Sequence, residues 1–218
     1  SALCTTDSLT STTERTTGAI KRKQRTSPRT PSRIDGEDWQ KGGGMKEHNN
    51  RKQADKFAEY ITGQGLRQYL AQKVKHYVGD NPTVFDGAVG SGQLEQHLNA
   101  RHVTGVEIQQ QACEVFLENY PTATVHNQSF FDFSGDIEAD CVVMNPPFSI
   151  KFKDLSDTEK SQIQAEFAWK KSGVVDDIFV LKSLKYAKRY AFYILFPGVG
   201  YRGTEKTFRE LIGNQLAE

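Results

Sequence analysis

The alternation of short apolar segments with amphipathic ones after residue 82 limits the fold of this chain more than any other feature of its sequence. Five segments have the length and composition of strands, and they are residues 83–86, 103–108, 124–126, 140–144 and 190–196. Helical periodicity predicts helices at 93–99, 110–119 and 175–188. Strands that alternate with helices pair in parallel through right-handed crossovers, and ligands bind at the carboxyl ends of such strands. The sequence therefore predicts an α/β domain over 80–218, with a mostly parallel sheet and flanking helices.

The chain before this domain divides into two parts. Residues 45–79 follow a helical pattern that a pair of glycines breaks into two helices. Residues 1–44 are rich in Ser and Thr, include a basic run at 21–33, and are predicted to be a disordered arm. This arm either binds nucleic acid or plays no part in the fold. Met45 follows a Lys-Gly-Gly-Gly tetrapeptide whose purine-rich codons could be a ribosome-binding site, so we expect the natural protein to begin at Met45.

Cysteine and apolar residues exclude several classes of protein. The three cysteines and five histidines show no metal-ligand spacing, which predicts no metal site and a reducing, cytoplasmic location. No run approaches the roughly 18 apolar residues of a membrane helix, so we expect no membrane association.

A glycine-rich turn follows the first predicted strand, where residues 86–92 read Asp-Gly-Ala-Val-Gly-Ser-Gly. Glycines at a strand-to-helix turn let the backbone turn tightly and come close to a ligand. Glu107 ends the next strand, 21 residues after Asp86, where a carboxylate can accept hydrogen bonds from both ribose hydroxyls of a nucleoside cofactor. The glycine spacing differs from the G-x-G-x-x-G that binds dinucleotide phosphates, so the turn fits S-adenosylmethionine, which has no phosphate, better than NAD.

An Asn-Pro-Pro-Phe corner follows the fourth predicted strand at residues 145–148. Each proline fixes φ and restricts the residue before it, so the corner is rigid. The Asn145 side-chain carbonyl and the Pro146 main-chain carbonyl can point together into the crevice and accept hydrogen bonds from an exocyclic amine, and Pro147 has no N–H that would compete. Phe148 offers a face on which a flipped-out base can stack. The alternative is a proline-rich strand end that only terminates the sheet.

These two motifs resemble those of a known family. Residues 86–92 resemble the Asp-Pro-x-x-Gly-Ser-Gly motif of adenine-N6 DNA methyltransferases, and residues 145–148 match their Asn-Pro-Pro-Phe motif in full. The order of the motifs, with the later segments 177–179 and 196–203, resembles the methylation subunits of type I restriction–modification systems. The resemblance covers about 83–211. It implies a Rossmann-like S-adenosylmethionine-dependent methyltransferase fold and transfer of a methyl group to the N6 amine of a flipped-out adenine in DNA.

The resemblance also assigns roles to single residues. Asn145 and Pro146 would hold the target amine and Phe148 would stack on the adenine. The candidate catalytic residues are Asn145, Pro146, Pro147 and Phe148. The candidate cofactor-binding residues are Asp86, Gly87, Ala88, Gly90, Gly92, Glu107, Ile108, Ser129, Phe130 and Asp132. The family's Asp-Phe pair after the third strand falls at Ser129-Phe130, so either Ser129 or the nearby Asp132 is expected to contact the cofactor adenine.

The chain departs from the family pattern in other places as well. Gly87 replaces the usual proline, a change that the turn can tolerate. Only the segment 63–65, Gly-Gln-Gly, could remain of the usual Gly-x-Tyr/Phe-x-Thr-Pro segment. The last two strands of the family's full sheet have no candidates, which predicts a C-terminally incomplete domain, and no target-recognition domain is visible.

The charge distribution bears on the expected partners, which are DNA and either a specificity subunit or a separate target-recognition domain. Eight Lys and Arg against five Asp and Glu give residues 1–44 a charge of +3, so a total of +1 leaves −2 for the rest. A protein that binds DNA by itself through many phosphates usually has a basic body. We therefore expect DNA binding to be shared. The lysines between 149 and 172, with Trp169, either contact DNA or belong to a solvated loop.

Two other functions remain open. Enzymes that methylate RNA bases or a protein glutamine also use an Asn-Pro-Pro-aromatic corner, because they too must hold a planar amine. A module that binds the cofactor, or only a partner subunit, without catalysing a reaction is the second alternative.

Overall fold

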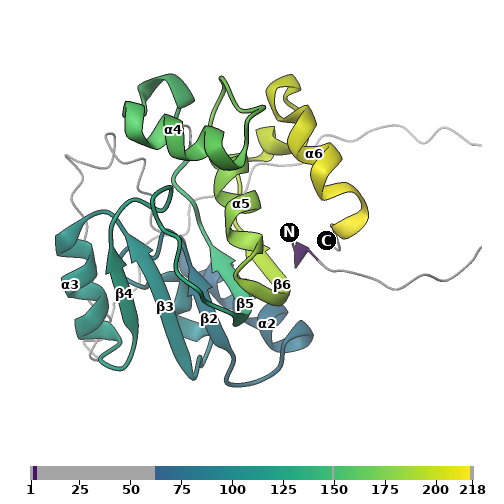
Figure 1. Ribbon diagram of the computed structural model, residues 1–218. Helices are drawn as coiled ribbons and strands as arrows, with labels where there is room; N and C mark the ends of the chain where they lie inside the picture. Colours follow the sequence, from purple (N-terminus) through teal and green to yellow (C-terminus); the bar gives the residue numbers. More distant parts are fainter. Residues whose placement is uncertain (1, 4–61, 149, 217–218) are drawn as a thin grey trace, which may run out of the picture. The chain divides into compact units, whose positions relative to one another are not determined.

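The computed structural model describes residues 2–3, 62–148 and 150–216, and it contains a six-stranded sheet in the order β1-β6-β5-β2-β3-β4 (Figure 1). The strands are β1 (Ala2–Leu3), β2 (Thr83–Asp86), β3 (His102–Glu107), β4 (Thr124–Asn127), β5 (Ala139–Met144) and β6 (Ala187–Tyr193). Strands β2 to β6 pair in parallel, and β1 pairs antiparallel with β6. The predicted α/β fold with a mostly parallel sheet is confirmed.

Five α-helices accompany the sheet in the part of the chain that the structure describes, and Figure 1 shows α3 beside the β4 edge. They are α2 (Gln64–Tyr77), α3 (Gln110–Asn119), α4 (Asp157–Glu166), α5 (Asp176–Leu184) and α6 (Lys206–Ile212). Among these described residues, no helix is long and apolar enough to cross a membrane.

Alternate residues of the central strands point to opposite faces of the sheet, and each face has its own core. Val142 and Met144 of β5 belong to the core that α4, α5 and α6 cover. Cys141 and Val143 belong to the core under α2 and α3. All four side chains are fully buried, which explains why this strand reads as a continuous apolar run rather than an alternating one.

The order of the parallel strands places a topological switch point between β2 and β5. The chain runs from β2 outward through β3 to β4, then returns to the other side of β2 with β5 and β6. In sheets of this kind the crossover connections leave in opposite directions at the switch point, and the crevice between them is the usual ligand site. Phe85 of β2 lies beside Val142 of β5, so the segments that follow these two strands begin next to each other.

Strand β2 and helix α3 have the predicted bounds, whereas other elements differ. Residues 93–99 form only a 3-10 helix, η1 (Leu94–His97), because Asn99 adopts a left-handed φ of 49° that ends the turn. The predicted helix at 175–188 ends at Leu184. Strand β6 starts three residues earlier than expected, since it pairs along the length of β5 from Ala139↔Ala187 to Met144↔Tyr193.

The segment 150–172, for which a solvated loop was one of the two alternatives, contains helix α4 and a short 3-10 helix, η2 (Phe152–Asp154). Helix α4 begins with a capping box, in which the Ser156 hydroxyl accepts from the Glu159 N–H at 3.2 Å and Glu159 accepts from the Ser156 N–H at 3.1 Å. This Ser-x-x-Glu signal was present in the sequence.

Two predictions fall outside the described residues. The helix expected before residue 62 lies there, and so does the disordered arm at 1–44 apart from Ala2–Leu3. After β6 the described chain continues as 3-10 turns and α6, with no further strand up to residue 216.

Candidate functional site

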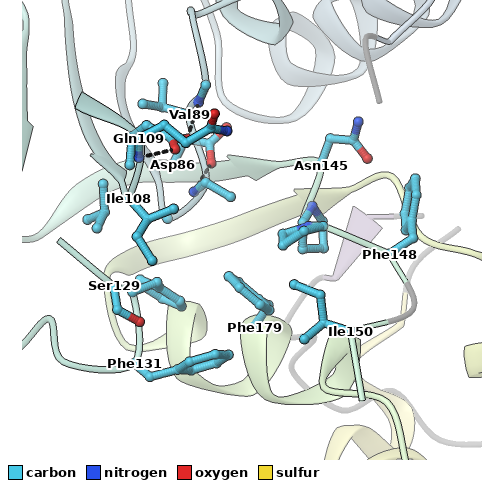
Figure 2. A pocket seen from close by; sticks show the side chains of 18 of the residues that line it. Asp86, Val89, Ile108, Gln109, Ser129, Phe131, Asn145, Phe148, Ile150 and Phe179 are labelled. Atoms are coloured by element: carbon cyan, nitrogen blue, oxygen red, sulfur yellow. Dashed lines mark hydrogen bonds between the residues drawn. The ribbon is translucent and has the colours of Figure 1, made fainter. Parts of the chain in front are cut away.

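A cleft of about 610 Å³ opens at the carboxyl ends of β2, β3 and β5, at the switch point of the sheet. Asp86 ends β2, Glu107 ends β3 and Asn145 follows β5, and all three line this cleft. In Figure 2, Asp86 and Ile108 lie on one side of it, and Asn145 and Phe148 on the other. Every predicted site residue lines the cleft except Gly92 and Asp132.

The glycine turn is shaped by close packing. Gly90 has a φ of 53° and no heavy atom within 4 Å of where a Cβ would stand, so its backbone faces the cleft with no side chain in the way. A Cβ on Gly92 would lie 2.3 Å from the Tyr120 ring, and the Tyr120 hydroxyl donates to the Gly92 carbonyl at 2.8 Å. Gly92 therefore shapes the turn from behind and does not face the cleft.

Both oxygens of the Glu107 carboxylate are oriented by main-chain donors. Oε2 accepts from the Gly90 N–H at 3.0 Å, and Oε1 accepts from the Gln109 N–H at 2.7 Å. Each oxygen of an ionised carboxylate can accept two hydrogen bonds, so an oxygen that takes one N–H can also take a ribose hydroxyl. The turn and this carboxylate thus hold each other in place at the floor of the cleft.

Asp86 shares its buried position with a second carboxyl group, that of Glu95 in η1. Asp86 is 1% exposed, and its Oδ1 accepts from the Ala88 N–H at 2.7 Å. Burial raises the pKa of Asp86 to about 7. Glu95 is 2% exposed, and burial together with the adjacent Asp86 raises its pKa well above the usual range. Two carboxyl groups so close together in an apolar site keep protons at pH values where exposed ones are ionised.

One wall of the cleft is apolar and aromatic. Ile108 lines the cleft with a side chain that is 52% exposed, so apolar surface is available to a ligand there. Phe130 stacks on Phe179 of α5, with ring centroids 5.5 Å apart and an interplanar angle of 17°. All three side chains line the cleft, although the two rings are mostly buried.

The two candidates for contact with the cofactor adenine lie in different places relative to the cleft. Ser129 lines the cleft, and its hydroxyl donates to Glu159 of α4 at 3.0 Å. Asp132 is exposed and does not line the cleft, because the chain turns away from it; the Asp132 N–H donates to the Ser129 carbonyl at 3.1 Å within this turn. Asp132 therefore lies outside the cleft, whereas Ser129 lines it.

The Asn-Pro-Pro-Phe corner lies where β5 ends. Asn145, Pro146, Pro147 and Phe148 all line the cleft, and Pro146 is buried. The Asn145 side-chain amide donates through Nδ2 to the Thr62 hydroxyl at 2.9 Å. Since Nδ2 is engaged with Thr62, this contact helps to orient the Asn145 carbonyl.

Sequence reasoning missed several residues of the site. Thr62 is 8% exposed and lines the cleft, and the only sequence signal for it was its position just before the Gly-Gln-Gly segment. The sequence around Glu159 shows a capping-box signal, but no sequence pattern indicates that Glu159 of α4 would accept a hydrogen bond from Ser129. Glu95 lay in a segment predicted as an ordinary amphipathic helix, where an acidic residue is expected to face solvent.

No group of three or more His, Cys, Asp or Glu side chains that could hold a metal ion occurs within the described ranges 62–148 and 150–216.

No family model matches the chain. Among solved structures, it is similar to a proposed RNA methyltransferase of Pyrococcus horikoshii, with a TM-score of 0.56, 22% identity and 78% of each chain covered. It is also similar to the methyltransferase subunit of a type I restriction–modification system from Streptococcus thermophilus, with a TM-score of 0.56 and 21% identity over 72% of this chain and 40% of the other.

A third similar structure is a proposed class I S-adenosylmethionine-dependent methyltransferase of Listeria monocytogenes, with a TM-score of 0.58 and 15% identity over 71% of this chain and 52% of that one. The chain thus spans about half or less of the length of two of these proteins. The sheet order and these likenesses show the Rossmann-like fold of S-adenosylmethionine-dependent methyltransferases.

Proposed function

We propose that this chain uses S-adenosylmethionine to methylate the exocyclic N6 amine of an adenine flipped out of DNA. The observation that carries the proposal is that one cleft joins the Glu107 carboxylate to the Asn-Pro-Pro-Phe corner at 145–148. The first fits a nucleoside cofactor and the second fits a planar amine. The cleft volume of about 610 Å³ lies within the roughly 300–1,000 Å³ of ordinary small-molecule sites.

The cofactor half of the cleft would be formed by the ends of β2 and β3. Glu107, held by the Gly90 and Gln109 N–H groups, would accept hydrogen bonds from the two ribose hydroxyls. Ile108 would cover one face of the cofactor adenine, and Ser129 lies where it could bond to the ring edge. When bound, the cofactor supplies an electrophilic methyl group on its sulfonium.

The target half would be formed by the corner after β5. The Asn145 side-chain carbonyl and the Pro146 main-chain carbonyl would accept from the two N6–H groups, which turns the nitrogen lone pair toward the methyl carbon. Phe148 would stack on the flipped base, a contact worth about 1–3 kcal/mol. The new N–C bond forms as the S–C bond breaks, and one N6 proton is released to solvent.

DNA is the favoured substrate, and a restriction–modification system is the favoured setting. The segments 177–179 and 196–203 resemble type I methylation subunits, and the subunit from Streptococcus thermophilus has a similar fold. The charge of −2 outside residues 1–44 supports a partner, such as a specificity subunit, that contributes to DNA binding. Methylation of RNA is the main alternative, because the similar protein of Pyrococcus horikoshii is a proposed RNA methyltransferase.

The test is transfer of labelled methyl from S-adenosylmethionine to unmethylated DNA, with RNA and protein extract in parallel. We expect N6-methyladenine in DNA, and about 10²–10³-fold slower transfer by Asn145→Ala, by analogy with loss of other preorganised polar groups. Gln111→Ala is the matched control, because it removes an amide from the exposed face of α3.

Three outcomes would overturn the proposal in different ways. Label in RNA or protein would change the substrate class, and full activity of Asn145→Ala would remove the corner from the mechanism. Cofactor binding with no transfer to any substrate, even with a specificity subunit added, would favour a non-catalytic module.

A further inference from the structure

A second hollow, of about 250 Å³, adjoins the cleft, and Lys151 lines both. We call it the basic pocket. Its lining combines four cationic side chains with one carboxylate, that of Glu205. The cationic residues are Lys151, Lys153, Lys171 and Arg202.

The fold gathers these lysines from a segment of mixed charge. Residue 151 forms an antiparallel bridge with residue 174, and the Phe152 N–H donates to the Gly173 carbonyl at 2.8 Å. This pairing brings Lys171 alongside Lys151 and Lys153. The acidic residues Asp157 and Glu159 belong to helix α4 and do not line the pocket. Asp154 lines the cleft but not the pocket, so the only charged residues that this segment contributes to the pocket are lysines.

The charge of the three lysines in the pocket is not neutralised by ion pairs with the described residues. Lys151, Lys153 and Lys171 are exposed and form no ion pair with any residue that the structure describes. Glu205 is 0% exposed, and its Oε2 accepts from the Thr204 hydroxyl at 2.6 Å and lies 3.4 Å from the Arg202 guanidinium.

The arginine is thus held in place by acidic groups, while the lysines retain their charge. A second carboxylate, Asp176, lies 3.6 Å from the Arg202 guanidinium. Arg202 therefore contributes shape and N–H donors more than net charge, and the three lysines make the pocket attractive to an anion.

We propose that the basic pocket binds a backbone phosphate of the substrate strand next to the flipped nucleotide; this inference rests on the proposed function. The two hollows share Lys151, and each nucleotide carries its base and its phosphate on one sugar, so a base in the cleft brings an adjoining phosphate near this pocket. Contacts to phosphate fix the register of a protein on nucleic acid without reading sequence. The residues outside 1–44 have a net charge of −2, and the basic pocket would give them a local site that attracts the phosphates of a DNA strand.

The test uses a short oligothymidylate of about four nucleotides, which supplies phosphates but no adenine. Binding is followed by the amide shifts of the full chain in ¹H–¹⁵N spectra. We expect the shifts of Gly173 and Thr204 to move, with an affinity that falls as salt rises. The double variant Lys153→Ala/Lys171→Ala should lose most of this response.

A charge-matched control is Lys75→Ala/Lys188→Ala, which removes two exposed lysines that pair with Asp80 and Asp140 respectively. It should respond as the wild type does. The proposal fails if oligothymidylate at millimolar concentration leaves the pocket amides unchanged, or if both double variants respond alike.

The same experiment separates this inference from the proposed function. Oligothymidylate binding without methyl transfer to adenine would keep the phosphate site and overturn the adenine assignment. Methyl transfer to adenine with no change in the amide shifts of the basic pocket would keep the adenine assignment and overturn the phosphate site. Cofactor binding, measured by calorimetry, should be equal in all three proteins, since neither lysine of the first variant lines the cleft.

Discussion

Replacing Thr62 by valine should slow methyl transfer without unfolding the site. The Thr62 hydroxyl accepts from the Asn145 amide at 2.9 Å, and the side chain is 8% exposed. Valine has nearly the same shape but no hydroxyl, so the Asn145 amide loses a contact that helps to orient it. A neutral hydrogen bond is worth about 0.5–1.5 kcal/mol net, which corresponds to about a 2- to 13-fold lower rate constant.

The assay is single-turnover transfer of labelled methyl to DNA at saturating cofactor, with the cofactor Kd measured separately. Thr62→Val should lower the rate of the chemical step and leave the cofactor Kd nearly unchanged. Thr62→Ser keeps the hydroxyl and should restore the rate to within about twofold of the wild type.

A double-mutant cycle provides the sharpest test of this positioning role. If Thr62 acts only through Asn145, then Thr62→Val should have no further effect in the Asn145→Ala background. The reasoning is refuted if Thr62→Val is as fast as the wild type. It is equally refuted if the loss is the same with and without the Asn145 side chain, because Thr62 would then act on something else.

Two further predictions concern buried charge. Folding raises the pKa values of Asp86 and Glu95. The stability that each protonated group contributes is therefore complete at pH values below its pKa in the unfolded chain, and it is lost as pH rises toward its pKa in the folded chain, which is about 7 for Asp86. The free energy of unfolding should therefore fall by up to about 1.4 kcal/mol per pH unit for each retained proton. In urea titrations between about pH 5 and about pH 7, Glu95→Gln should show a shallower decline than the wild type. Equal dependence of the unfolding free energy on pH in the two proteins would contradict the shared site. Lys170→Met would remove the ammonium that lies 2.7 Å and 2.6 Å from the two oxygens of Asp177, which is 0% exposed. The stranded carboxylate should cost about 3–5 kcal/mol in urea denaturation, and a loss below about 1 kcal/mol would mean that the pair is not stabilising.

Much of the central fold follows from local pattern. Strand β2 and helix α3 have the predicted bounds because apolar periodicity and the bounding Pro, Asp and Asn residues are signals within a few residues of each other. The placement of Asp86, Glu107 and Asn145 at one edge also follows, since each comes at the end of a strand and the ends of parallel strands meet.

The limits of β6 could not be read from its own residues. Its apolar stretch suggested 190–196, but the strand is Ala187–Tyr193 and includes the charged Lys188 and Arg189. The hydrogen-bonded register with β5 decides these bounds, and a register is a property of two strands together.

The sequence by itself determined the alternating fold, the glycine turn and the rigid corner, because each of these depends on the conformational preferences of neighbouring residues. Only the tertiary structure decided that Thr62 meets Asn145 across 83 residues, that Glu95 lies against Asp86, and that lysines from a mixed-charge segment gather into one pocket. These contacts join residues that no local preference links. They arise where the sheet and its connections bring distant segments together, and there the site acquires its specific chemistry.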